Sequence, residues 1–441
     1  MAAANRVLRG TLNAAKKFVF EDATLAFKDK TTKELAQAWT VLTACKHHNR
    51  IERWRPGSVE RMMDYLPRLC VMPFFNHFVA GESEEEIAPV MARLREQGVE
   101  GILDYAAEAK LEQGEAKAKT SSGAVAREFV YEAEHVCDAN ARTFALAIAA
   151  VKNVTPQGFA ALKVTALGNP VLLEEASSKI RSGEEVSLAE LGTIERRLRK
   201  LARQASDLGV GVMVDAESYQ HQPAIDYLAK QLQREFNTTK PTVLNTYQCY
   251  LKDSRGRLEK DLELAKSEGW VFAAKLVRGA YMKNEGERAK RLGYENPIHD
   301  SYEDTSSNFN QCVDLVLDHL AKAQRKTSVM VATHNRDSIE HTIETMERLG
   351  ISMVGGEDQD RGGVHFAQLL GMSDYLTFSL AHHGLQAFKY IPYGPLEEVM
   401  PYLLRRAQEN SELLTKVDEE RALLLQEVFR RFLKPFSLAK G

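Results

Sequence analysis

The sequence predicts a (β/α)8 barrel of the TIM type preceded by a small N-terminal helical domain. Eight short apolar runs recur between about residues 100 and 391, and helical segments separate them. The runs are apolar throughout rather than alternating, which is typical of parallel strands covered on both faces. Eight successive strand-helix units close into a barrel. The expected strands are 100–105, 159–166, 210–216, 242–249, 271–279, 327–334, 364–368 and 386–391. A further apolar run, Tyr375 to Ala381, is assigned to helix or loop.

Helical signals dominate the first hundred residues. Thr31 with Glu34 and Ser83 with Glu86 have the spacing of capping boxes. Gly98 fits the end of the helix that Ser83 begins. We therefore divide the chain into an N-terminal helical region, residues 1–97, and a barrel with C-terminal helices, residues 98–441.

Composition excludes several classes of partner. The net charge is -3 with both signs mixed along the chain, so no basic surface for nucleic acid is expected. The five cysteines include no C-x-x-C pair, which favours reduced thiols inside a cell. No apolar run approaches the roughly 18 residues that span a bilayer, so any membrane contact is expected to be peripheral.

The first twenty residues resemble an organelle transit peptide. They contain Arg6, Arg9, Lys16 and Lys17 and no acidic residue. An ordinary basic first helix is the alternative.

Arg405 and Arg406 form an adjacent pair in an expected helix that follows a Pro/Gly turn. Neighbouring guanidinium groups on a helix repel each other, whereas an anionic ligand can engage both. The pair therefore indicates a carboxylate or phosphate clamp. Two solvated arginines on an amphipathic helix are the alternative.

Polar residues collect at the ends of the expected strands, where barrel enzymes place their chemistry. They are Asp104, Glu108, Lys163, Asp215, Glu217, Gln248, Lys275, Arg278, Tyr281, His334, Asn335, Gln368 and Tyr390. A buried lysine needs an anion, so Lys163 and Lys275 suggest an anionic ligand. An ion pair of Lys163 with Asp215 or Glu217 is the alternative. A metal site would have to combine His334, Asp215 and His365, and their spacing does not indicate one.

Six segments together resemble the flavin-dependent proline dehydrogenases, and most closely their mitochondrial eukaryotic members. The resemblance runs from about residue 98 to 411. It is carried by KVTALG from Lys163, MVDAE from Met213, TYQCYLK from Thr246, KLVRGAY from Lys275, VATHN from Val331, and KYIPYGPLEEV from Lys389 with YLLRRAQEN from Tyr402.

The resemblance implies a non-covalent FAD, which suits the absence of a G-x-G-x-x-G motif after any expected strand. Gln248 would face the flavin ring and Lys275 its N5 edge, where bacterial members usually have arginine. The remaining cofactor-binding residues implied are Arg278, Gly279, Ala280, His334, Asn335 and Glu409.

For the substrate, the resemblance implies that Arg405, Arg406 and Lys163 bind the carboxylate of L-proline. Asp215 would orient its neighbours. Glu108, four residues after Asp104, would pair with the first arginine and act as a gate. The pocket around the ring would consist of Tyr281, Leu369, Tyr390 and Tyr402. Relatives that prefer 4-hydroxyproline typically have a small residue, commonly serine, at the position of Tyr390, so its bulk favours L-proline.

The activity implied is oxidation of L-proline to 1-pyrroline-5-carboxylate by hydride transfer to flavin N5. Electrons would pass to a quinone through peripheral contact with the matrix side of the inner mitochondrial membrane. The amphipathic segment 417–433 could supply that contact or pack onto the barrel. From the residues alone, a Schiff-base lyase using Lys163 or Lys275 and a non-catalytic carboxylate-binding barrel remain alternatives.

Overall fold

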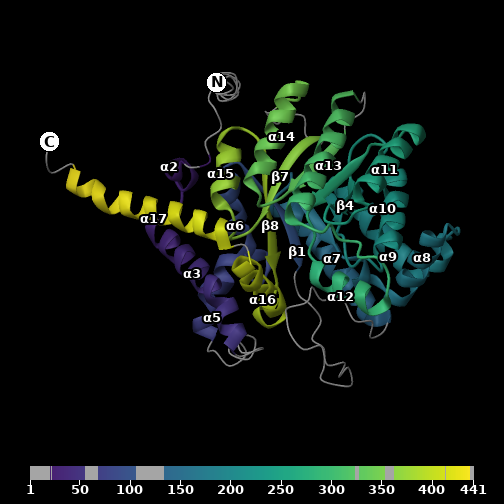
Figure 1. Cartoon of the computed structure of the whole chain (residues 1–441), viewed down its shortest axis with the longest axis horizontal. Coiled ribbons are helices and arrows are strands. Elements are labelled where there is room, and N and C mark those ends of the chain that lie inside the picture. The colour runs from purple at the N-terminus through teal and green to yellow at the C-terminus, as the bar shows by residue number, and fades with distance from the viewer. Residues whose placement is uncertain are drawn as a thin grey trace. The chain divides into compact units, whose positions relative to one another are not determined.

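The computed structural model describes residues 20, 22–54, 68–105, 134–322, 327–352, 362–412 and 414–437. Its parallel strands form a closed barrel in the order of the sequence (Figure 1), which confirms the predicted fold. The strands are β1 Val99–Tyr105, β2 Phe159–Leu162, β3 Gly211–Val214, β4 Val243–Gln248, β5 Ala273–Val277, β6 Ser328–Ala332, β7 Gly363–Leu369 and β8 Gln386–Tyr393.

The strand register follows the buried apolar runs. In β2 and β3, Phe159 is opposite Gly211 and Leu162 is opposite Val214, and every residue of both strands is buried. Strands covered on both faces need no polar alternation, which is why the runs are apolar throughout.

The second strand is shorter than the sequence predicts. The expected strand 159–166 ends at Leu162, and Val164–Leu167 form a 3-10 helix. The backbone N–H of Thr165 donates to Glu217 Oε1 at 3.0 Å. A side-chain acceptor therefore replaces the ladder partner of this amide, and apolar composition alone could not reveal that.

The chain forms two compact units, one of which contains Glu100–Tyr105 and the described residues from 134 to Ala367. In this unit α10 packs against β4 and lies beside α9 (Figure 1). The unit's helices are α7 Glu134–Val154, α8 Pro170–Ser182, α9 Leu188–Leu208, α10 Gln222–Phe236, α11 Ser254–Glu268, α12 Met282–Leu292, α13 Tyr302–Lys322 and α14 Arg336–Leu349. The predicted helical connection between residues 167 and 209 is confirmed by α8 and α9.

The other unit contains the described residues up to Val99 and those from Gln368 onward. Its helices are α2 Ala23–Ala26, α3 Thr32–Trp54, α5 Arg68–Phe78, α6 Glu84–Glu96, α15 Asp374–His382, α16 Leu396–Glu412 and α17 Leu414–Ser437. The run from Tyr375 to Ala381 is helical, as assigned. Within this unit the last helix, α17, packs along α3 of the N-terminal region (Figure 1).

Side chains join α17 to the N-terminal helices. Lys46 Nζ lies 2.7 Å from Asp418 Oδ2, and the guanidinium group of Arg421 lies 5.5 Å from the ring centroid of Trp39. Leu424 is buried, whereas Phe429 and Phe432 are exposed. The apolar side of α17 is thus used for packing against α2 and α3 over part of its length.

The two predicted capping boxes have different outcomes. Thr31 N donates to Glu34 Oε2 at 2.8 Å and Glu34 N donates to Thr31 Oγ1 at 3.2 Å, which confirms the first. The second is wrong, because Ser83 makes no side-chain cap and Glu86 accepts from Glu82 N at 2.9 Å instead. Gly98, with a φ of 79°, follows the end of α6 as expected.

Within the ranges described, no helix has the length and apolarity needed to cross a bilayer. The transit-like residues 1–19 lie outside those ranges.

Candidate functional site

Lys275 and Asp215 form a buried ion pair between β5 and the end of β3, the two strands that flank β4. Lys275 lies in β5 and Asp215 directly follows β3, and their side chains are 6% and 13% exposed. A buried ammonium group is costly unless an anion meets it, and Asp215 supplies that anion within the protein. The predicted need of Lys275 for an anion is therefore met by a protein carboxylate. The pair fixes a positive charge where barrel enzymes place their chemistry.

Lys163 has a looser partner. Its Nζ lies 4.0 Å from Asp104 Oδ2, beyond hydrogen-bonding distance, and its side chain is 20% exposed. Lys163 stands at the N-cap of the 3-10 helix, and Asp104 belongs to β1. The side chain of Lys163 is thus less buried than that of Lys275.

Glu217 connects the ends of three strands. Its carboxylate accepts from both the backbone and the hydroxyl of Thr165, next to the end of β2. Its carbonyl accepts from Gln248 Nε2 at 2.8 Å, at the end of β4. Glu217 is buried, and this arrangement fixes the side chain of Gln248. The sequence placed Glu217 among the strand-end residues and suggested it as an alternative ion-pair partner of Lys163, but it did not indicate the contacts with Thr165 and Gln248.

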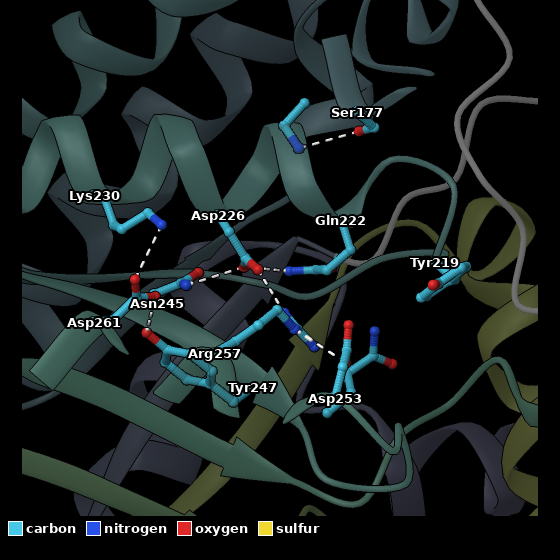
Figure 2. A network of polar contacts seen from close by, with 12 residues as sticks. Ser177, Tyr219, Gln222, Asp226, Lys230, Asn245, Tyr247, Asp253, Arg257 and Asp261 are labelled. Carbon is cyan, nitrogen blue, oxygen red and sulfur yellow. Dashed lines mark hydrogen bonds and ion pairs between the residues drawn. The ribbon is translucent and has the colours of Figure 1, made fainter. Parts of the chain in front are cut away.

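A second layer of polar contacts supports Glu217. Glu217 N donates to Gln222 Oε1 at 2.9 Å, and Gln222 Nε2 donates to Asp226 Oδ1 at 2.7 Å. Figure 2 shows Asp226 between Gln222, Asn245 and Arg257. Because Asn245 belongs to β4, the network ties α10 to β4 and steadies both ends of the Glu217 contact.

Gly279 follows β5 at a position that only glycine fits. Its φ is 145°, and a Cβ there would lie 1.5 Å from the ring of Tyr250. Tyr250 cannot move aside easily, because it is fully buried and its hydroxyl donates to Glu285 Oε2 at 2.8 Å. Burial also raises the pKa of Tyr250 well above its usual value. Ala280, the next residue, is exposed.

The guanidinium group of Arg278 is held by the protein. It donates to Thr333 and to Ser338 Oγ at 3.0 Å, and it lies 4.6 Å from the ring centroid of Phe309. Burial lowers the pKa of Arg278 from its usual value. The side chain thus connects β5 to α13 and α14.

Asn335 caps α14. Its Oδ1 accepts from Ser338 N at 3.0 Å, and its Nδ2 donates to the hydroxyl of Tyr302 at 2.7 Å. Thr333, which the sequence analysis did not single out, accepts from Asn335 N at 3.0 Å. The sequence could have indicated Thr333, because it lies within the VATHN segment directly before His334. His334 and Tyr281 are half-buried.

In the other unit, the two adjacent arginines lie against one tyrosine ring. The guanidinium carbons of Arg406 and Arg405 lie 4.8 Å and 6.0 Å from the ring centroid of Tyr402. Arg406 is only 7% exposed, so the alternative of two solvated arginines is wrong for this residue. Tyr402 and Leu369 pack in the same apolar cluster. Tyr390 is half-buried, and its carbonyl accepts from Leu370 N at 3.0 Å.

Two expected residues cannot be located. Glu108 lies outside the described ranges, and Glu409 lies in α16 with its side chain outside the described part. Among the described side chains, no three His, Cys, Asp or Glu residues group as metal ligands would.

Comparisons with a family model and with individual proteins agree on one family. A family model described as proline dehydrogenase matches residues 88–419. The chain is 32% identical to proline dehydrogenase 1, mitochondrial, of Homo sapiens, over 93% of this chain and 89% of that protein. It is 34% identical to the hydroxyproline dehydrogenase of Rattus norvegicus, over 92% of this chain and 93% of that protein.

Solved structures of proline utilization A share the fold. The protein from Bdellovibrio bacteriovorus, inactivated by N-propargylglycine, superposes with a TM-score of 0.63 at 20% identity, covering 92% of this chain and 40% of that one. A mutant of the Bradyrhizobium japonicum protein gives a TM-score of 0.59 at 18% identity, covering 93% and 43%. The chain thus spans about two fifths of the length of these proteins.

Replacing Gly279 by alanine is expected to cost at least about 3 kcal/mol of stability, because the new methyl group would overlap the held ring of Tyr250. Gly293→Ala is the matched control, since its φ is 72° but no atom lies within 4 Å of the added Cβ. The control should cost only about 1 kcal/mol of backbone strain. Chemical denaturation measures both. Equal losses would contradict the role of Tyr250.

Proposed function

Because the chain belongs to the proline dehydrogenase family, we propose that it is a FAD-dependent enzyme that oxidises L-proline to 1-pyrroline-5-carboxylate. The observation that carries the proposal is the fixed ammonium group of Lys275. It lies in the KLVRGAY segment and is paired with Asp215 of the MVDAE segment. Both segments match the family pattern, and the pair holds the ammonium group of Lys275 in one orientation.

The side chains near this charge suit a flavin. Lysine, glutamine and backbone amides are the donors that a flavin ring and its phosphates require. Gln248, Lys275, Gly279 and Ala280 supply them, with Arg278, His334, Asn335 and Glu409 as the further residues that the family pattern assigns. When bound, FAD would supply the acceptor for the hydride that leaves the carbon next to the ring nitrogen of proline.

The roles of the protein are then positioning and electrostatics. Asp215 holds the ammonium group of Lys275, which stabilises negative charge that develops beside it. Glu217 holds Gln248 through its carbonyl oxygen. A preorganised charge of this kind needs no rearrangement during the reaction.

The family pattern assigns the substrate residues. Arg405, Arg406 and Lys163 would bind the carboxylate, because charge-assisted bonds to one anion offset the repulsion between adjacent guanidinium groups. Tyr281, Leu369, Tyr390 and Tyr402 would enclose the ring. Glu108, with Asp104 nearby in the sequence, would pair with Arg405 and steady it.

We further propose that the electrons pass to a quinone at the matrix side of the inner mitochondrial membrane. Several relatives carry the word mitochondrial in their names, and the first twenty residues have transit-like composition. The exposed Phe429, Phe432 and Leu433 of α17 offer apolar side chains for a peripheral contact.

Oxidation of hydroxyproline is the second candidate function. The alignment with the rat hydroxyproline dehydrogenase spans 444 positions, against 545 for human proline dehydrogenase 1, so the former needs fewer gaps. Tyr390 opposes this candidate, because a tyrosine at that position of the proposed pocket would crowd the extra hydroxyl.

A Schiff-base lyase is disfavoured at Lys275. The lysine of such an enzyme must attack as a free amine. Here that step would first have to break the buried pair with Asp215.

Arg406→Met should raise the KM for L-proline by about ten- to a hundredfold, because each hydrogen bond to a charged group is worth about 1.5 to 3 kcal/mol. Flavin content should not change. Arg421→Met is the control, since Arg421 also lies over an aromatic ring but outside the assigned site. Steady-state kinetics and the flavin-to-protein absorbance ratio measure both effects. An unchanged KM in Arg406→Met and in Arg405→Met would contradict the clamp.

Tyr390→Ser should shift preference toward trans-4-hydroxy-L-proline. One poorly solvated hydroxyl in a closed pocket costs a few kcal/mol, so the parent should favour L-proline by about ten- to several-hundredfold in kcat/KM. In the serine variant, the ratio of kcat/KM for L-proline to that for trans-4-hydroxy-L-proline should be lower than in the parent. A parent that prefers hydroxyproline, or a variant with an unchanged ratio, would show that Tyr390 does not line the pocket.

A further inference from the structure

Lys389 is a fully buried lysine with three acceptors. Its Nζ lies 2.7 Å from Asp374 Oδ1, 2.7 Å from the carbonyl oxygen of Met372 and 3.2 Å from that of Leu369. An ammonium group has three donors, so these contacts satisfy it completely. Lys389 directly precedes Tyr390 on β8. Successive residues of a strand point to opposite faces, so Lys389 and Tyr390 do not share a face.

The partner of Lys389 is held from other elements. Asp374 begins α15, and its second carboxylate oxygen accepts from Lys30. Burial opposes ionisation of Asp374, but the two ammonium groups outweigh it and hold its pKa well below the usual value. The carboxylate of Glu420, from α17, accepts from the backbone N–H groups of Ser373 and Asp374 at 2.9 Å each.

The turn between β7 and α15 has a strained backbone that the contacts of Lys389 and Glu420 hold in place. Among the described residues, Ser373 is the only one other than glycine with a positive φ, 51°. Gly371 has a φ of 77°, and a Cβ there would lie 2.3 Å from the carbonyl oxygen of His77. Backbone in these conformations persists only where the surroundings hold it.

The start of this turn is joined to β8 at two positions assigned to the substrate pocket, Leu369 and Tyr390. The turn starts at Leu369, whose carbonyl accepts from Lys389. Leu370 N donates to the carbonyl of Tyr390 at 3.0 Å. Lys389 therefore binds the backbone carbonyl oxygen of Leu369 and is also the residue before Tyr390 in β8. For this reason it fixes the distance between Leu369 and Tyr390.

We propose that Lys389 is a positioning residue of the imino-acid pocket, which sets the separation of Leu369 and Tyr390 and thereby the discrimination between proline and its 4-hydroxylated form. This inference rests on the proposed function. Lys389 acts through the backbone of the turn and does not touch the substrate.

The test compares Lys389→Met with Lys30→Met. Each substitution removes one ammonium group from Asp374 and leaves the other. The variants differ in that Lys389→Met also removes the hydrogen bonds to the backbone carbonyl oxygens of the turn. Lys389→Met should raise the KM for L-proline about tenfold or more, with kcat changed by less than about threefold, since misplacing binding groups by about 1 Å is costly. It should also change the proline-to-hydroxyproline ratio of kcat/KM at least about fivefold. Lys30→Met should leave KM and the ratio within about twofold while lowering the Tm.

The ratio of kcat/KM for two substrates on one preparation does not depend on the fraction of folded enzyme. Loss of stability alone therefore cannot mimic the expected result. If Lys389→Met gives no folded protein, Lys389→Gln is used with Lys30→Gln as its control, because the amide keeps one donor for a turn carbonyl. Equal effects at positions 389 and 30, or an unchanged ratio, would overturn the inference. A parent that does not oxidise proline would instead refute the proposed function.

Discussion

The requirement that every buried lysine meet a carboxylate governs both halves of this molecule. Lys275 of β5 is paired with Asp215, and Lys389 of β8 is paired with Asp374. Removing one partner of a buried pair leaves an uncompensated charge, which costs about 3 to 5 kcal/mol. Both strands are therefore held by charge as well as by apolar packing.

This constraint also explains how the protein positions the ammonium group of Lys275. Asp215 orients the ammonium group of Lys275 before any ligand binds, and Glu217 orients the amide of Gln248 from the neighbouring strand. Behind Glu217, the contacts among Gln222, Asp226 and Asn245 leave little freedom for the strand ends. Electrostatic preorganisation of this type lowers the barrier of a reaction that develops charge.

Much of this arrangement could be predicted from the sequence, because the barrel strands are buried on both faces and read as apolar runs. The strand boundaries could not. Val164 to Leu167 are as apolar as a strand, yet the carboxylate of Glu217 holds Thr165 in a 3-10 turn. A lysine within an apolar strand needs an anion, and this holds for Lys389 in QAFKYI as it does for Lys163 and Lys275. The partners of Lys389 could not be predicted from the sequence, because contacts between residues far apart in the sequence leave no local pattern.

The most direct test of the account is an anaerobic titration of the purified protein with L-proline, followed by visible absorbance. The account predicts a protein that binds FAD and whose flavin absorbance bleaches on addition of L-proline and returns on addition of a quinone. A protein that binds no FAD, or a flavin whose absorbance does not respond to L-proline or hydroxyproline, would contradict it. Borohydride trapping of a substrate adduct on Lys163 or Lys275 would point to a Schiff-base enzyme instead.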